Sequence, residues 1–228
     1  MKKIVIGVPL VNKSMHPDFV KSLVGSVYAS FDADVEFFVD FESGSTYIDI
    51  NKNVIANRVL KSNVVNAVIF LSPNISWTPK SLSLLINHEK DIVSGVFPEP
   101  TTFKETYSVQ LSEDQDIFGE NLKADYVNMD VCYVSKEALK AISKHCPSSD
   151  GGEFTFFFMP QIKNGLYNPS SAVFCEAAKA AGIDINVEKT ANFGNIGEIQ
   201  FDGNYEKVTQ QEWVDNQAEM QDVERGLI

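Results

Sequence analysis

Cysteine and histidine are scarce in this sequence of 228 residues, which contains three of each. Cys132, Cys146 and Cys175 are widely spaced and include no CxxC pair, so they predict neither a disulfide framework nor a structural zinc site. The histidines are equally scattered, at positions 16, 88 and 145. This pattern is typical of a protein from a reducing compartment, and we expect a cytoplasmic location.

Long apolar runs and an excess of positive charge are also missing. No run is long enough to cross a bilayer, and the apolar stretch in the opening MKKIVIGVPLVNK is only about eight residues, which predicts a first strand and no membrane association. The net charge of -12 and the absence of a Lys/Arg block disfavour binding to nucleic acid. The remaining composition, 44% hydrophobic and 22% charged, is that of a globular protein with a substantial core.

Apolar runs alternate with helical patterns in the first half of the chain. The expected strands are 3–9, 34–41, 65–71 and 92–96; the expected helices begin at Pro17, span 49–61, and begin again at the Thr78-Pro79 cap. This order predicts an α/β fold in which helices flank a mostly parallel, doubly wound sheet. Ligands bind beyond the carboxyl ends of such strands, which here are Pro9-Leu10, residues 40–45 and residues 72–74.

The second half is less regular. Residues 98–123 predict a long loop or hairpin, residues 124–135 one strand, and residues 154–160 an apolar strand or a packed edge. Further predictions are a helix over 136–145 capped by Ser135, a helix over 170–181 that Gly182 stops, and a strand over 183–188.

The end of the sequence differs in character from the rest. Thr209-Gln-Gln-Glu212 has the form of a capping box and predicts a polar helix that ends at Gly226. We therefore divide the chain into a main domain, 1–205, and a C-terminal helical tail, 206–228.

Several stretches in order resemble the small GT-A glycosyltransferases, family 2-like, of bacteria and of phages or large DNA viruses. The stretches are HPDFVKSL (16–23), GS with NKNVIANRVL (44–60), VIFLSPNISWTPKSLSLLINHEKDIVSGVFP (68–98), VCYVSKEAL (131–139) and SSAVFCEAAKAAGIDINVEKTANFGNIGE (170–198). The resemblance implies a GT-A-like fold that binds a nucleotide sugar, and a divalent cation, Mn²⁺ or Mg²⁺, that neutralises the leaving diphosphate. It implies nucleotide contacts at Pro9, Ser45, Lys52 and Asn53.

This sequence departs from the family where the family carries charge. The positions of its Asp-x-Asp, Glu-Asp and His motifs are here Ser72-Pro73-Asn74, Ser170-Ser171 and Asn195. The family's Arg-Asn pair is Lys52-Asn53, which keeps a cation but loses the guanidinium fork. A site without a carboxylate holds Mg²⁺ or Mn²⁺ poorly, so we expect no metal here.

Some of these residues have two interpretations. Asp130, where the family has a small residue, is either a relocated carboxylate that serves as catalytic base or metal ligand, or a loop residue that closes the cleft. Lys52 and Asn53 are either nucleotide contacts or solvated helix residues. Ser170 and Ser171 are most simply helix N-caps. Trp77 is either a sugar platform or a packing residue.

The sequence leaves three classes of function open. The first is a glycosyltransferase that works without a metal, and the second is a non-catalytic module that binds a nucleotide sugar, a glycan or a protein partner. The third is a structural or assembly protein, such as a component of a phage particle in the host cytoplasm or virion, which associates with itself or with a partner. The fold alone does not decide between them, because function depends on the site.

Overall fold

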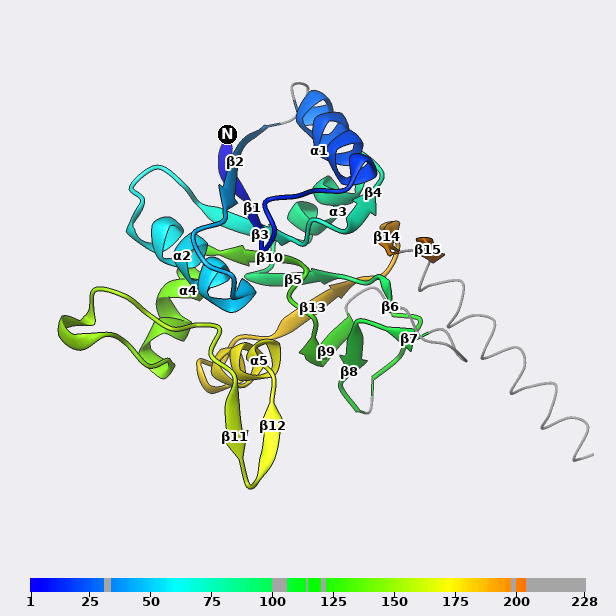
Figure 1. Ribbon diagram of the computed structural model, residues 1–228. Helices are drawn as coiled ribbons and strands as arrows, with labels where there is room; N and C mark the ends of the chain where they lie inside the picture. The colour runs from blue at the N-terminus through cyan, green and yellow to red at the C-terminus, as the bar shows by residue number, and fades with distance from the viewer. Residues whose placement is uncertain (31–33, 100–105, 114, 120–121, 198–199, 204–228) are drawn as a thin grey trace, which may run out of the picture.

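The computed structural model describes residues 1–30, 34–99, 106–113, 115–119, 122–197 and 200–203. Their centre is an eight-stranded sheet with the order β2-β1-β3-β10-β5-β13-β9-β8 (Figure 1). Its strands are β1 (Lys2–Pro9), β2 (Val35–Glu42), β3 (Ala67–Leu71), β5 (Ile92–Gly95), β8 (Val109–Leu111), β9 (Leu122–Val127), β10 (Val131–Ser135) and β13 (Ile185–Glu188). β9 and β10 run against the strands beside them, and the others share one direction, so the predicted mostly parallel sheet is confirmed.

Helices cover both faces of this sheet (Figure 1). They are α1 (Pro17–Ser30), α2 (Ile48–Lys61), α3 (Ser81–Asn87), α4 (Lys136–Ile142) and α5 (Ser170–Ala180), with single 3-10 turns at Ser143–His145 and Asp150–Gly152. One apolar core joins a face of the sheet to α2, α4 and α5, and a second joins the other face to α1 and α3. The protein is therefore a three-layer α/β structure, as the alternation of patterns predicts.

Small strands complete the fold outside the main sheet. They are β4 (Ile75–Trp77), β14 (Phe193–Ile196) and β15 (Gln200–Gly203), which pair with one another, and the hairpins of β6 (Pro98–Glu99) with β7 (Thr106–Tyr107) and of β11 (Gln161–Lys163) with β12 (Leu166–Asn168). The sequence did not predict β4 or β14. Both matter for the site, because their ladder places Asn195 opposite Ile75, the first residue of β4, just after the turn that follows β3.

Two local predictions were wrong, and in a third one of the two alternatives is right. The strand expected at 124–135 is two strands, β9 and β10, separated by the turn at 128–130. Residues 154–160 form no strand beyond one isolated bridge at Thr155, and the alternative of a packed segment is right, since Phe157 and Phe158 are buried. The helix expected from Thr78-Pro79 begins at Ser81.

Helix ends gave mixed results. Ser135 caps α4, because its hydroxyl accepts a hydrogen bond from the backbone N–H of Ala138 at 2.9 Å. The sequence suggested that Ser170 and Ser171 are N-caps, and this was wrong. They are the first two residues of α5, and Pro169 is the N-cap. Gly182 follows the end of this helix with φ of 74°, as predicted.

Two further observations bear on the sequence predictions. The predicted C-terminal helix and the whole tail at 206–228 lie outside the described residues. Among the residues that are described, no helix is both long and apolar enough to span a membrane.

Candidate functional site

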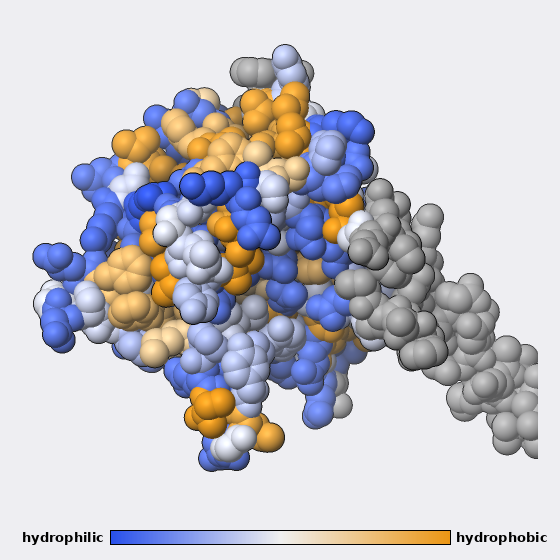
Figure 2. All heavy atoms as spheres, in the orientation of Figure 1, coloured by the Kyte–Doolittle hydropathy of each residue, from blue (hydrophilic) through white to orange (hydrophobic). Residues whose placement is uncertain are grey.

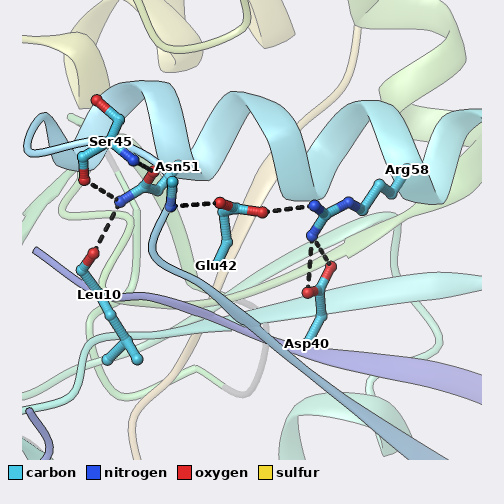
Figure 3. A network of polar contacts seen from close by, with 7 residues as sticks. Leu10, Asp40, Glu42, Ser45, Asn51 and Arg58 are labelled. Carbon is cyan, nitrogen blue, oxygen red and sulfur yellow. Dashed lines mark hydrogen bonds and ion pairs between the residues drawn. The ribbon is translucent and has the colours of Figure 1, made fainter. Parts of the chain in front are cut away.

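Parallel strands β1 and β2 end beside a turn that a polar network holds in place (Figure 3). Glu42, the last residue of β2, accepts a hydrogen bond from the backbone N–H of Gly44 and forms an ion pair with Arg58 of α2 at 2.6 Å. The buried Asn51 receives a bond from the backbone N–H of Ser45 and donates to two carbonyls, those of Ser45 and of Leu10 after β1. The first turn of α2 is therefore fixed to the ends of both strands, next to Pro9 and Ser45.

Lys52 points into the protein and not into solvent. Its side chain is 5% exposed, and its ammonium forms an ion pair of 2.9 Å with Asp130, whose side chain is 24% exposed. The ammonium also lies 5.8 Å from the ring centre of Phe158. Because the charge of Lys52 is balanced within the chain, the interpretation of this residue as a solvated helix position was wrong.

Two asparagines of α2, one helical turn apart, hold the segment 155–158. Asn53 donates to the carbonyl of Phe158 at 2.7 Å and accepts from its backbone N–H at 2.9 Å. Asn57 makes the same pair of bonds with Thr155, at 2.8 and 2.9 Å. The side-chain amides thus supply the hydrogen-bond partners that a neighbouring strand would give to the backbone. Asn53 is fully buried, so its interpretation as a solvated helix position was also wrong.

The turn after β3 contains the positions at which the resemblance implies a metal motif. Ser72 is buried, and its backbone N–H donates to the carbonyl of Asp130 at 2.9 Å. The Asn74 amide donates to the Asn195 side-chain oxygen at 2.8 Å, and the carbonyl of Asn74 accepts from the N–H of Ile196. Two positions 121 residues apart in the sequence therefore bind each other directly.

The first residues of α5 are also engaged within the chain. The Ser170 hydroxyl donates to the carboxylate of Asp49, in the first turn of α2, at 2.5 Å. Ser171 shares a hydrogen bond with Tyr126 of β9. Burial above all raises the pKa of the Tyr126 hydroxyl, and nearby groups that include Asp130 add to this rise.

The structure gathers the predicted residues at the carboxyl ends of the parallel strands. Lys52 and Asp130 form a direct pair, Asn74 and Asn195 a second, and Ser72 links them through the backbone of Asp130. Sequence reasoning missed the residues that bind these positions. They are Asn51, Asn57 and Asp49 of α2, Tyr126 of β9, and Phe158.

The donor set fits a divalent cation poorly. Mg²⁺ and Mn²⁺ prefer carboxylate oxygens, but the positions of the expected ligands carry serine and asparagine, and the Asn195 oxygen already accepts the Asn74 amide. Across the described part of the chain, no three His, Cys, Asp or Glu side chains are grouped so that they could hold a metal ion. We therefore derive no chemical step that requires a metal.

Glu188, at the end of β13, anchors the loop that leads to Asn195. One carboxylate oxygen binds His88 at 2.8 Å, and the other accepts bonds from the N–H and hydroxyl of Thr190 and from the N–H of Ala191. Burial alone would raise the pKa of Glu188, but the hydrogen bonds from His88 and Thr190 outweigh it and lower this pKa to about 2.

This anchor predicts a specific acid response. A carboxyl whose pKa falls on folding stabilises the protein above the unfolded value of 4.5, and this stabilisation is lost as the pH falls from there toward about 2. We expect the loss to be about 3 kcal/mol in the wild-type protein, and Glu188→Gln to remove that part of the pH dependence. Denaturant unfolding at a series of pH values measures it, with the exposed Glu153→Gln as control. Equal acid slopes in all three proteins would contradict the assignment.

Comparisons with known proteins bear on the fold. No protein-family model matches the sequence, and no curated protein sequence matches it. The structure is similar to that of A197 from STIV, with a TM-score of 0.52 and 12% identity over 86% of each chain. It is also similar to GalNAc-T7 solved with UDP, GalNAc and Mn²⁺, with a TM-score of 0.53 and 7% identity; the match covers 86% of this chain but 43% of GalNAc-T7.

Identities this low concern architecture and carry no activity across. The similar structures and the three-layer arrangement around a mostly parallel sheet agree with each other and with the expected fold class. The chain has a GT-A-like α/β fold.

Proposed function

We propose that this chain is a glycosyltransferase-like protein that binds a nucleotide sugar and does not use metal-dependent transfer. One observation carries the proposal, namely the 2.8 Å hydrogen bond between Asn74 and Asn195. It joins two positions at which the resemblance implies metal or diphosphate ligands. A pair of neutral amides cannot replace the anionic oxygens that hold a hard cation beside a diphosphate.

In this proposal Lys52, which pairs with the partly exposed Asp130, supplies the cation for nucleotide binding. Lys52 is fixed within the first half of α2, and in this proposal its ammonium offsets the diphosphate charge in the role that a metal has elsewhere. Pro9 and Ser45 lie at the ends of β1 and β2, where the nucleoside would bind. Asn53 acts as a positioning residue, because both ends of its amide bind the backbone of Phe158.

Asp130 is the candidate general base in this proposal. Its carboxylate lies 2.9 Å from the Lys52 ammonium, and in this proposal it accepts a proton from a sugar hydroxyl. Turnover by the metal-free protein would support this role, whereas binding without turnover would make the protein a non-catalytic binding module.

The proposal predicts binding that does not depend on a metal. Calorimetric titration with UDP and GDP sugars should give the same Kd in Mn²⁺ as in EDTA. UDP-GalNAc is a natural first ligand, since GalNAc-T7 was solved with UDP and GalNAc. Lys52→Met should weaken binding by at least about tenfold, because a charge-assisted contact to phosphate is lost.

Two checks make this titration decisive. Lys144→Met removes a cation from an exposed position and should bind like the wild type. Circular dichroism should confirm that Lys52→Met is folded, since that variant leaves Asp130 without its partner. A strict requirement for Mn²⁺ would contradict the proposal.

A non-catalytic structural or assembly protein is the second candidate, and the same ion pair favours it. Lys52 with Asp130, Asn74 with Asn195, and Ser170 with Asp49 satisfy one another without a ligand. Failure to bind any nucleotide sugar, in a protein shown to be folded, would overturn the first proposal and favour this one.

A further inference from the structure

The β2 edge of the main sheet carries acidic side chains but lacks most of the other features that protect an exposed strand. Among the described residues β2 pairs with β1 alone, in unbroken register over eight residues. Its sequence, VEFFVDFE, contains no proline, glycine or lysine. Natural edge strands are commonly short, bulged, or interrupted by proline or lysine, which prevents pairing with another chain. β2 has none of these protections.

The opposite edge of the same sheet is protected. β8 has three residues, Val109–Leu111, and its register with β9 is irregular between Gln110 and Leu111. A short strand with a bulge is a poor template for a further strand. The two edges of the sheet therefore differ: the β8 edge is a poor template for a further strand, and the β2 edge is a good one.

Within the described ranges, no strand pairs with the outer edge of β2. The carbonyls of Asp34 and Glu42 accept bonds from Lys2 and Leu10, on the β1 side. Backbone groups alternate in direction along a strand, so those of Val35, Phe37, Val39 and Phe41 point away from β1. These four residues supply a row of donors and acceptors suited to one more strand.

An apolar surface continues from this edge onto α1. Val39 and Phe41 are 38% and 44% exposed, and on α1 Val20 and Val24 are 39% and 47% exposed. Val20 and Val24 lie one helical turn apart, on the side of α1 away from Gly25, which packs toward Pro79. Figure 2 shows hydrophobic residues gathered over α1 and toward β2. We call these four residues, with the outer edge of β2, the edge surface.

Most of the charge along the strand is balanced within the chain. Four carboxylates lie on residues 34–42 and pair with three cations: the N-terminal ammonium with Asp34 at 2.9 Å, Lys3 with Glu36 at 3.7 Å, and Arg58 with both Asp40 at 2.9 Å and Glu42 at 2.6 Å. Two copies of a protein with net charge -12 repel each other in general. At this edge the repulsion is offset locally, so like chains can approach here.

We propose that the edge surface binds a second copy of this chain, through antiparallel pairing of β2 with β2 about a two-fold axis. About such an axis both copies use the same surface patch: if residue i of one copy contacts residue j of the other, residue j of the first also contacts residue i of the second. It would extend the sheet across the dimer and place both α1 helices on the same side, with their apolar residues toward each other. The inference does not depend on nucleotide binding.

Sedimentation velocity over a range of concentrations tests the proposal. The wild type should sediment as a dimer at concentrations up to about 100 μM and dissociate on dilution. Val39→Lys places an ammonium within the edge surface and should weaken association by at least about tenfold. Val64→Lys makes the same change at an exposed site after α2, outside the edge surface, and should leave association unchanged.

A second variant tests the backbone pairing itself. The N–H of Val39 points outward, so Val39→Pro removes a donor from the open edge without breaking the β1–β2 ladder. It should also give monomers, with thermal unfolding and circular dichroism showing that both Val39 variants are folded. A wild type that stays monomeric at about 100 μM overturns the proposal, as does a dimer that both folded Val39 variants retain.

Discussion

Replacing Asp130 by alanine is expected to destabilise the protein by about 4 kcal/mol, because it leaves the buried Lys52 ammonium without its partner. Lys52 is 5% exposed and cannot turn into water without leaving the contact with Phe158. The cost comes from an uncompensated charge more than from a lost attraction. Urea unfolding of wild type and variant at pH 7 measures it.

The double variant separates these two causes. Lys52→Met with Asp130→Ala removes the charge as well as its partner, so most of the lost stability should return. A single variant that costs less than about 1 kcal/mol would show that water reaches Lys52 and screens its charge. A double variant as unstable as Asp130→Ala alone would show that Asp130 acts through its backbone turn instead.

Replacing Asn53 by alanine should cost a similar amount, about 4 kcal/mol. Its amide satisfies both backbone groups of the buried Phe158, and each unpaired buried group costs about 1–3 kcal/mol. Loss of these bonds also releases the backbone of Phe158, the residue whose ring lies against the Lys52 ammonium. Denaturant unfolding gives the free energy, and near-ultraviolet circular dichroism reports on the aromatic packing.

Two further variants sharpen this result. Asn53→Asp keeps the acceptor for the Phe158 N–H but places a carboxylate against its carbonyl, so it should be no better than alanine. Asn63→Ala, at an exposed site just after α2, should change stability by less than about 0.5 kcal/mol. Equal stability of Asn53→Ala and Asn63→Ala would contradict the role given to Asn53.

The sequence predicts those parts of the fold that local periodicity determines. The buried runs at β1, β3 and β5 and the helices α1 and α2 follow directly from apolar spacing. The apolar run 124–135 hid a break between two strands, β9 and β10, which run in the same direction at separate places in the sheet. Met129, in the turn between them, is buried and reads like a strand residue. Residues 154–160 looked like a strand, but their backbone partners are side chains about 100 residues earlier in the sequence. No local pattern reveals a partner at that distance.

The candidate site was predictable to a similar extent. The order of strands and the resemblance to the family indicated which positions meet at the carboxyl ends of the sheet. They did not indicate which of those positions bind one another. The Asn74–Asn195 pair depends on β4 and β14, two short strands with too few residues to produce a periodic signal.

The asparagine contacts of α2 have a consequence for how this protein can vary. Asn53 and Asn57 contact segment 155–158 through the backbone N–H and carbonyl of Phe158 and Thr155, and every amino acid other than proline has both of these groups. The path of this segment is thus set through its main chain and does not depend on which side chains it carries. Because those side chains include the buried Phe157 and Phe158, the apolar composition of the core beside α2 can change while the path of the backbone stays fixed.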